Sequence, residues 1–353
     1  MAIPLALIAA ITLADVITPR EITLSPLLVT APAITASFAG PWLTGLVSVV
    51  TIADEVLLGL HSEMLATRPM QTQLAALVVV SAFLVIFSFV RDRHQEELIR
   101  VRSVSEAAQR ALLRPLPAGL GPLRLASVYL AAEEEAQIGG DLYAAARTPT
   151  GARVVIGDVR GKGLPSVSDA ALLLGAFREA ARRHATLPDV VLHLDESVRA
   201  DLEEHAEEFA DACENFITAA VLDIPDDRQV VEVIDCGHPP PLLLRDRQVM
   251  TLQVAQPAPP LGLGELSQPG YHVQTFDFRA GDTLLLYTDG VIEARGDAGV
   301  FYPLAERVTA WPGDGPETLV EHVRDDLLAY VGGRLGDDAA MVAIQRLPER
   351  EPG

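Results

Sequence analysis

The chain has 353 residues, of which 27 are lysine or arginine and 48 are aspartate or glutamate, and its formal net charge at pH 7 is -21. This acidity excludes nucleic acid as the main partner, because no basic stretch offsets the repulsion from a phosphate backbone, whereas divalent cations are attracted to it. The two cysteines, Cys213 and Cys236, form neither a CxxC pair nor a disulfide-dense pattern, which is typical of a reducing cytosol.

Residues 1–90 are poor in charge and are predicted to form a membrane region of three or four helices. The last apolar stretch carries no charge over a length close to the ~20 residues that a bilayer requires. Acidic residues and prolines interrupt the earlier stretches, so three spans, or four with tilted or broken helices, are both compatible with the sequence. The candidate spans are Ile3 to Ile17, Leu24 to Phe38, Trp42 to Leu60 and Gln73 to Val90.

The arginines that follow the last span predict the orientation of the chain. Arg91, Arg93, Arg100 and Arg102 lie directly after it, and the positive-inside rule then places everything beyond residue 90 in the cytoplasm. We therefore expect a multi-pass protein of the inner (cytoplasmic) membrane. A cleaved signal peptide is the competing interpretation of the first stretch, but a basic segment before it is lacking.

Residues 91–119 are predicted to be a helical linker. Its first part is charged and helix-forming, with a stripe of small or apolar residues at three- and four-residue steps. The stripe could join two copies through a short coiled coil at 91–113, giving a homodimer, or pack against the chain's own domain. The sequence Arg114-Pro115-Leu116-Pro117-Ala118-Gly119 ends the helix. The stripe residues are Leu98, Val101, Ser105, Ala108 and Leu112.

Residues 120–346 are predicted to form one α+β domain, followed by a frayed tail at 347–353. Two amphipathic helices, Ser166 to Ala185 and Leu187 to His205, follow each other between groups of strands, which favours antiparallel sheets with helices outside over a doubly wound parallel sheet. The expected strands are Leu125 to Leu130, Arg153 to Gly157, Phe216 to Asp223, Gln229 to Asp235, Pro241 to Leu244, His272 to Phe278, Thr283 to Tyr287 and Ala340 to Ile344.

Several aspartates lie where an expected strand meets a turn. Asp141 follows two glycines, Asp158 follows an apolar strand, Asp289 precedes Gly290, and the pair Asp337-Asp338 precedes the last strand. Antiparallel pairing could bring these carboxylates to one end of a sheet. Carboxylates, carbonyls and water are the ligands of hard cations such as Mg²⁺ and Mn²⁺. Zinc is less favoured, because the histidines and cysteines show no zinc-site spacing.

Six motifs, in a fixed order, resemble a known family. The region from about Leu120 to Gln345 is similar to the bacterial SpoIIE-type branch of the metal-dependent PPM (PP2C-like) serine/threonine phosphatases. The motifs are Ile138-Gly139-Gly140-Asp141-Leu142-Tyr143, Gly157-Asp158-Val159-Arg160-Gly161-Lys162-Gly163, Phe216-Ile217-Thr218-Ala219, Cys236-Gly237-His238-Pro239-Pro240-Pro241, Tyr287-Thr288-Asp289-Gly290-Val291-Ile292-Glu293 and Gly336-Asp337-Asp338-Ala339-Ala340.

The resemblance implies an αββα sandwich of two antiparallel sheets flanked by helices, with two Mn²⁺ or Mg²⁺ ions at one end. By resemblance, the ligands are Asp141, Asp158, the Val159 backbone carbonyl, Asp289 and Asp337. Residues expected to support these ligands are Gly140, Gly161, Gly290 and Asp338, and which aspartate of the Asp337-Asp338 pair binds metal directly stays open.

The same resemblance implies a serine/threonine phosphatase, which the expected N-terminal spans would anchor to the membrane. Two cations would activate a water for in-line attack on phosphorus, so no protein nucleophile is needed. The implied substrate is a phosphorylated anti-anti-sigma (STAS) regulator in a partner-switching pathway. The alternative is a non-catalytic membrane receptor whose degenerate phosphatase domain only binds a partner.

Some residues in or near these motifs have other interpretations. Gly157 to Lys162 is not a P-loop, because its glycines are one residue too close and Gly163 replaces the usual Ser or Thr. His238, flanked by prolines, is expected to be structural. Ala144 and Ala340 replace the family's usual aspartate and threonine, and the first change is expected to cost a hydrogen bond near the metals rather than a ligand.

Overall fold

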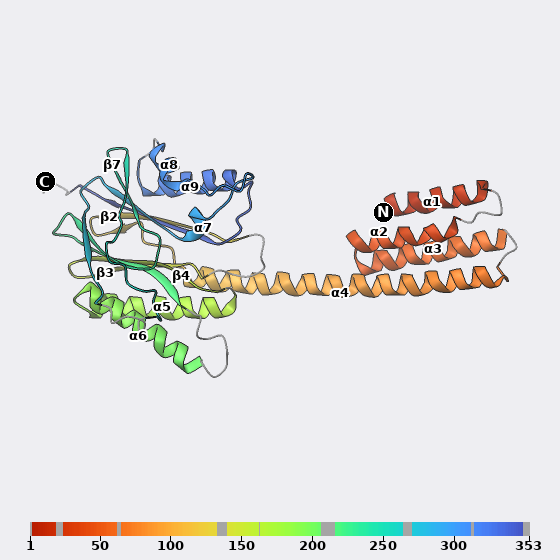
Figure 1. Cartoon of the computed structure of the whole chain (residues 1–353), viewed down its shortest axis with the longest axis horizontal. Helices are drawn as coiled ribbons and strands as arrows, with labels where there is room; N and C mark the ends of the chain where they lie inside the picture. Colours follow the sequence, from red (N-terminus) through yellow and green to blue (C-terminus); the bar gives the residue numbers. More distant parts are fainter. Residues whose placement is uncertain are drawn as a thin grey trace. The chain divides into compact units, whose positions relative to one another are not determined.

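The computed structural model describes residues 2–18, 24–61, 65–132, 140–161, 163–205, 216–263, 270–311 and 314–348 (Figure 1). The chain divides into two compact units, Met1–Arg100 and Val101–Gly353. Several predictions concern residues or side chains outside this description: Ile138, Gly139, Lys162 and Cys213 are not described, and neither are the side chains of the linker stripe except Leu112.

The elements described in the N-terminal unit are all helices. It contains α1 (Ala2–Ile17), the 3₁₀ helix η1 (Ser25–Val29), α2 (Thr30–Phe38), α3 (Pro41–His61) and the first part of α4 (Arg68–Leu112). Among the described residues, two helices are long and apolar enough to cross a membrane, Pro41–His61 and Arg68–Gln95, and the apolar helices Ile3–Ile17 and Ser25–Phe38 are shorter. All four predicted apolar segments are therefore helical, but only two pass the test of length and composition.

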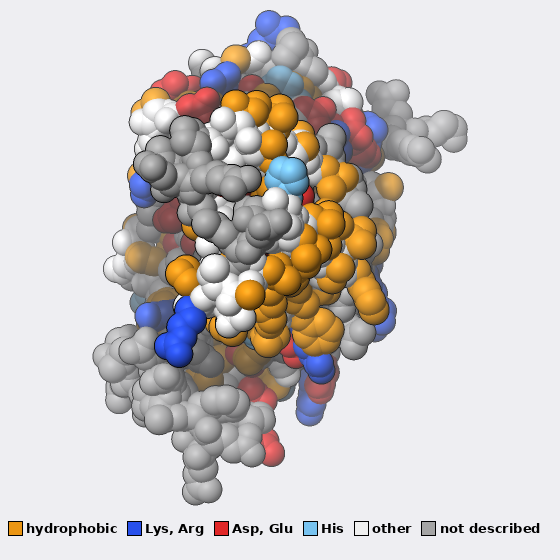
Figure 2. Space-filling model, turned by 90° about the vertical axis from the view of Figure 1, so that its right-hand side faces the viewer, with side chains coloured by type: hydrophobic (Ala, Val, Ile, Leu, Met, Phe, Trp, Pro, Cys, Tyr) orange, Lys and Arg blue, Asp and Glu red, His pale blue; other side chains and the backbone are white. Residues whose placement is uncertain are grey.

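Large apolar side chains are exposed on this unit. Phe38 and Trp42 are 89% and 93% exposed, and along α4 Val79 and Phe83 are 67% and 66% exposed. Figure 2 shows hydrophobic side chains gathered over a broad area. Such an area is unusual on a soluble protein and is suited to contact with lipid.

Acidic side chains of α3 face other helices of the same unit rather than solvent. Asp54 accepts a hydrogen bond of 2.5 Å from Thr12 of α1, and Glu55 is 1% exposed. Arg91 of α4 donates to the carbonyls of Ala36 and Ala39, which are left without helical partners where α2 ends.

The second unit packs two antiparallel sheets face to face, which confirms the predicted α+β sandwich. The six-stranded sheet has the order β1 (Gly119–Leu120), β2 (Leu123–Leu130), β11 (Ala339–Arg346), β10 (Thr283–Tyr287), β7 (Leu242–Arg245) and β8 (Gln248–Thr251). The five-stranded sheet has the order β3 (Leu142–Arg147), β4 (Gly151–Val159), β5 (Ile217–Pro225), β6 (Val230–Cys236) and β9 (Gln274–Asp277).

Helices cover the outer face of each sheet (Figure 1). The five-stranded sheet carries α5 (Leu164–Arg183) and α6 (Leu187–His205), both close to their predicted bounds. The six-stranded sheet carries α9 (Pro316–Tyr330), α8 (Leu304–Thr309) lies beside α9 and β8, and the short α7 (Asp289–Ile292) follows β10. Helix α9 was not predicted, although Leu319, Val323 and Leu327 form a buried stripe at helical spacing.

The central strands of the six-stranded sheet are buried on both faces. In β11, Ala340, Val342 and Ile344 join the core between the sheets, whereas Ala339, Met341 and Ala343 join the core under α9. Alternate residues of a strand point to opposite faces, so one apolar run serves two cores.

Strand bounds differ from prediction mainly at their ends. β4 continues through Val159, so Asp158 is paired with Thr218 inside the ladder instead of following the strand in a turn. β3 was missed because its sequence, Leu-Tyr-Ala-Ala-Ala-Arg, is rich in alanine, which is depleted in strands. Pairing along its whole length with β4 makes it a strand despite that composition.

Arg153 fastens α5 to the five-stranded sheet. Its side chain lies on β4, is 4% exposed and forms an ion pair of 2.9 Å with Asp223 of β5. The same guanidinium donates to the carbonyls of Ala181, His184 and Ala185, which are the last acceptors of α5 and the turn after it. One buried cation therefore satisfies a helix end and a neighbouring carboxylate.

Replacing Arg153 with methionine should strongly destabilise this unit. The change leaves Asp223 and three carbonyls unpaired, so we expect a loss of about 3 kcal/mol and a melting temperature lower by about 6–12 °C in the detergent-solubilised chain. Arg183→Met is the matched control: it breaks an exposed pair with Glu179 and should cost about 0.5 kcal/mol or less. Equal melting temperatures for the two variants would contradict this role of Arg153.

Candidate metal centre

The predicted acidic residues lie at adjoining strand ends of both sheets. Asp141 directly precedes β3 and Asp158 lies near the end of β4, and the pairing of Leu142 with Gly157 sets them beside each other. In the other sheet, β10 ends just before Asp289 and β11 begins just after Asp338, because Tyr287 pairs with Met341. Antiparallel pairing thus brings segments distant in sequence to the same place.

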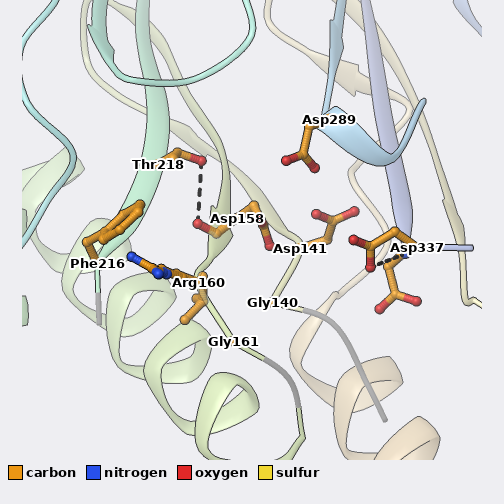
Figure 3. Close-up of a pocket in the computed structure, with 11 residues that line it drawn as sticks. Gly140, Asp141, Asp158, Arg160, Gly161, Phe216, Thr218, Asp289 and Asp337 are labelled. Carbon is orange, nitrogen blue, oxygen red and sulfur yellow. Dashed lines mark hydrogen bonds between the residues drawn. The ribbon is translucent and has the colours of Figure 1, made fainter. Parts of the chain in front are cut away.

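These aspartates line one pocket of about 370 Å³. Figure 3 shows Asp141, Asp158, Asp289 and Asp337 around a common space. The structure therefore brings together all the acidic side chains that the sequence singled out. The lining residues are Gly140, Asp141, Asp158, Val159, Arg160, Gly161, Phe216, Thr218, Asp289, Asp337 and Asp338.

Thr288 joins the two sheets beside this pocket. Its hydroxyl donates a hydrogen bond of 2.7 Å to Asp141 and accepts one of 2.9 Å from the backbone N–H of Ala340. The Thr288 side chain is fully buried, so both bonds are shielded from water. Sequence reasoning missed this residue, although its place in the Tyr-Thr-Asp-Gly motif, directly before Asp289, was a usable signal.

The two aspartates of the Asp337-Asp338 pair have different surroundings. Asp338 is 4% exposed and accepts hydrogen bonds from the Tyr129 hydroxyl at 2.5 Å and the Ala132 N–H at 2.6 Å. Asp337 is exposed and accepts a bond from the N–H of Asp338 at 3.0 Å. Both residues line the pocket, and the carboxylate of Asp338 also holds the segment that follows β2.

Glycines are required where the strand ends approach most closely. A Cβ on Gly290 would lie 1.8 Å from the carbonyl oxygen of Asp338, and a Cβ on Gly140 would lie 2.3 Å from that of Val159. Gly161 has a φ of 113°, which other residues rarely adopt. The backbone around the pocket therefore accepts no side chain at these points.

Burial and mutual repulsion raise the pKa of two pocket carboxyls. For Asp141 the larger cause is burial, followed by the negative charge of Asp158, and the hydrogen bond from Thr288 opposes both. For Asp289 burial again comes first, followed by the charges of Glu293 and Asp337. A cluster of this kind is stabilised by a positive charge placed among its members.

The donor set fits a hard divalent cation. The pocket offers carboxylate oxygens and backbone carbonyls and contains neither histidine nor cysteine. Within the described residues, no three Asp, Glu, His or Cys side chains stand close enough to form a metal cage by themselves. Mg²⁺ and Mn²⁺ suit such a site, because they retain several waters and need few protein ligands.

His238 lies next to the pocket but does not line it. Its ring Nδ1 is 3.2 Å from the hydroxyl of Thr218, and its backbone N–H donates to the carboxylate of Asp235 at 2.8 Å. Burial lowers the pKa of His238 to about 3, so the ring is neutral at physiological pH. A permanently neutral ring that fixes a turn agrees with the expected structural role.

Arg160 is the pocket's cationic side chain among the described residues, and its guanidinium lies 5.1 Å from the centre of the Phe216 ring.

Ala144 is buried in β3 and does not line the pocket. Cys236 is fully buried, and burial raises the pKa of its thiol, so it is not a nucleophile.

The fold is that of the PP2C phosphatase domains. The SiaA PP2C domain of Pseudomonas aeruginosa has a TM-score of 0.55 and 18% identity, over 72% of this chain and 97% of that one. The PP2C domain and regulatory fragment of Bacillus subtilis SpoIIE give a TM-score of 0.50 and 17% identity, over 63% of each chain.

Residues 148–347 match the family model of stage II sporulation protein E (SpoIIE), and the chain belongs to this family. It is 24% identical over 214 residues to the phosphoserine phosphatase RsbU of Bacillus subtilis. The RsbU and RsbW domains of a Mycobacterium tuberculosis protein give 26% identity and a TM-score of 0.51, over 65% of this chain. The matches span 60% of RsbU and 62% of the mycobacterial chain.

Adding a methyl group at Gly290 should deform the pocket. Because its Cβ would lie 1.8 Å from the Asp338 carbonyl oxygen, Gly290→Ala should lower the free energy of unfolding by about 2 kcal/mol or more and weaken Mn²⁺ binding measured by calorimetry. The control is Gly175→Ala in α5, where nothing lies within 4 Å, which should raise stability by about 0.5–1 kcal/mol. Wild-type Mn²⁺ affinity in Gly290→Ala would refute the close approach.

Proposed function

We propose that the protein is a membrane-anchored, Mn²⁺- or Mg²⁺-dependent phosphatase that hydrolyses phosphoserine or phosphothreonine in proteins. The observation that carries the proposal is the gathering of Asp141, Asp158, Asp289 and Asp337 around one pocket at the end of the sandwich. Membership of the SpoIIE family and the similarity to RsbU support it.

In this mechanism, Asp141, Asp158, Asp289, Asp337 and the Val159 carbonyl would hold two cations. Such ions would supply a water of lowered pKa and would neutralise the phosphate oxygens, which is the chemistry that in-line displacement of the serine or threonine oxygen requires. Thr288 holds the Asp141 carboxylate in one orientation. Gly140, Gly161, Gly290 and Asp338 shape the backbone around the ligands.

We infer that the substrate is a STAS-type anti-anti-sigma regulator in a partner-switching pathway. The relatives with RsbU domains support this inference. We also propose a multi-pass arrangement in the inner membrane with the phosphatase unit in the cytoplasm. The exposed apolar helices and the arginines after residue 90 favour this arrangement. A homodimer through the 91–113 helix remains part of the proposal.

The alternative is a non-catalytic membrane receptor that uses this unit only to bind a partner. All the aspartates expected as ligands line the pocket, which argues against it. Metal stoichiometry separates the two functions, because the phosphatase requires two ions and a receptor requires neither for partner binding.

Asp289→Asn should abolish catalysis without unfolding the chain. With Mn²⁺ present, the purified full chain in detergent should release phosphate from p-nitrophenyl phosphate and from a phosphoserine peptide, and the variant should be slower by about a hundredfold or more. EDTA should abolish the wild-type activity and added Mn²⁺ should restore it. The control is Asp277→Asn, at an aspartate on β9 whose side chain is 61% exposed. Undiminished turnover by Asp289→Asn would contradict the mechanism.

Replacing Asp337 with asparagine should weaken metal binding, whereas replacing Asp338 with asparagine should lower stability. Asp337→Asn should weaken Mn²⁺ binding by at least about tenfold with little change in melting temperature. Asp338→Asn should lower the free energy of unfolding by about 1.5–3 kcal/mol, since it weakens charge-assisted hydrogen bonds to Tyr129 and Ala132. Calorimetric titration and thermal unfolding of both variants test the assignment, and the opposite pattern would reverse it.

A further inference from the structure

Polar side chains from four helical segments meet inside the apolar N-terminal unit. Asp54 of α3 accepts a hydrogen bond of 2.5 Å from Thr12 of α1. Asp15, in the last turn of α1, accepts one of 2.5 Å from the backbone N–H that precedes η1. Gln73 of α4 donates to the hydroxyl of Ser25, the first residue of η1, at 2.7 Å. These contacts fix polar groups within a unit whose helices are otherwise mostly apolar.

Glu55, the residue after Asp54, has an unsatisfied carboxylate. The residue is 1% exposed, and its Oε1 atom has no hydrogen-bond partner. Gln73, Asp15 and Asp54 lie close to this carboxyl group, yet Oε1 receives no hydrogen bond from any of them. A buried polar atom without a partner is costly, so it calls for an explanation. We call Thr12, Asp15, Ser25, Asp54, Glu55 and Gln73 the Glu55 cluster.

The Glu55 cluster contains three carboxyl groups, and none of them forms an ion pair with a described residue. Of the described basic side chains in this unit, His61 and Arg68 are exposed, and Arg91 binds Asp92 and the carbonyls that end α2. A buried ionised carboxylate without a counter-ion is strongly unfavourable, in lipid above all. The cluster therefore attracts a positive charge that the described part of the chain does not supply.

The cluster lies near one end of the helical unit. Asp15 is in the last turn of α1, Glu55 in the last two turns of α3, and Gln73 in the first two turns of α4 (Figure 1). Arg91 marks the opposite end, where α2 finishes. Glu55 is about 9 Å from the end of α3, since a helix rises 1.5 Å per residue. In the proposed membrane arrangement this end faces away from the cytoplasm, so a small ion reaches the cluster from outside.

The cluster is suited to a small ion of single charge. Carboxylate, hydroxyl and amide oxygens are ligands for hard cations, and Glu55 Oε1 can equally take a proton. A large organic cation is excluded from Oε1, because this atom has almost no contact with solvent. A divalent ion that keeps several waters is disfavoured for the same reason.

We propose that the Glu55 cluster is a binding site for a small monovalent cation, a proton or Na⁺, that enters from the end of the unit where α1 and α3 finish. The ion neutralises Glu55 at Oε1, while Thr12 holds Asp54 and the N–H before η1 holds Asp15. The site does not depend on the phosphatase function, and it adds a ligand to the N-terminal unit.

Dicyclohexylcarbodiimide tests the charge state of Glu55 in the full chain in detergent. This apolar reagent adds to a protonated carboxyl group in an apolar environment and rearranges to a stable N-acylurea, which mass spectrometry locates. A carboxylate that has lost its proton or holds Na⁺ does not react. Labelling of Glu55 should be strong in mildly acidic buffer and fall severalfold as the pH is raised. A fall with NaCl at constant pH, but not with choline chloride, would identify Na⁺ as an occupant.

Thermal unfolding of Glu55→Gln provides a second measurement. At alkaline pH without Na⁺, the variant should melt about 2–4 °C above the wild-type chain, because it lacks the buried charge. The difference should shrink as protons or Na⁺ are added, since a ligand of the folded state stabilises only the wild-type chain. The matched control is Asp92→Asn, at a carboxylate paired with Arg91 at 2.6 Å. Its difference from the wild-type chain should not change with pH or Na⁺.

The two measurements decide the proposal together. Dependence of either readout on pH or Na⁺ supports the site, provided that Asp92→Asn does not reproduce the behaviour of Glu55→Gln. Labelling of Glu55 that is absent or constant, combined with a constant difference in melting temperature, would overturn it and leave Glu55 as a permanently neutral structural residue. Phosphate release enters neither measurement, so the outcome is independent of whether the chain is an active phosphatase.

Discussion

The hydrogen bond from Thr288 to Asp141 connects the two sheets where their acidic ends meet. Asp141 is 3% exposed and lies near other carboxylates, so burial and charge repulsion both act against its ionised form. The Thr288 hydroxyl favours that form and is itself held by the Ala340 N–H of the neighbouring strand. The orientation of this buried carboxylate thus depends on the register of β10 against β11, and that register depends on both cores.

The rest of the unit keeps this junction in place. Each sheet contributes two of the four proposed carboxylate ligands, so the sheets must keep their relative position for the pocket to exist. Close packing of β11 on both faces resists sliding. In the five-stranded sheet, Arg153 fixes the end of α5 to β4, the strand that carries Asp158. Cation binding would offset the remaining repulsion among the carboxylates.

Local patterns in the sequence predicted much of this arrangement. The glycine-flanked aspartates and the alternating strands gave the acidic residues and the antiparallel sandwich, and β10 was predicted with its observed bounds. Local patterns could not predict the features that depend on pairing between segments distant in the sequence. β3 is a strand because β4 pairs with it, and Thr288 matters because Asp141 lies across the sheet junction. The stripe of apolar residues in α9 is present in the sequence, but it is short and prolines and glycines lie close to it.

The place of β11 in the six-stranded sheet has a consequence for biosynthesis. β11 follows all the other described strands along the chain, yet it lies between β2 and β10, which are therefore joined only when it arrives. Asp337, Asp338 and the Ala340 N–H that holds Thr288 come with it. During translation the apolar helices of Met1–Arg100 leave the ribosome before this strand. A growing chain therefore exposes its apolar helices before its acidic pocket is complete, and a chain that stops short of β11 lacks the Ala340 N–H that holds Thr288.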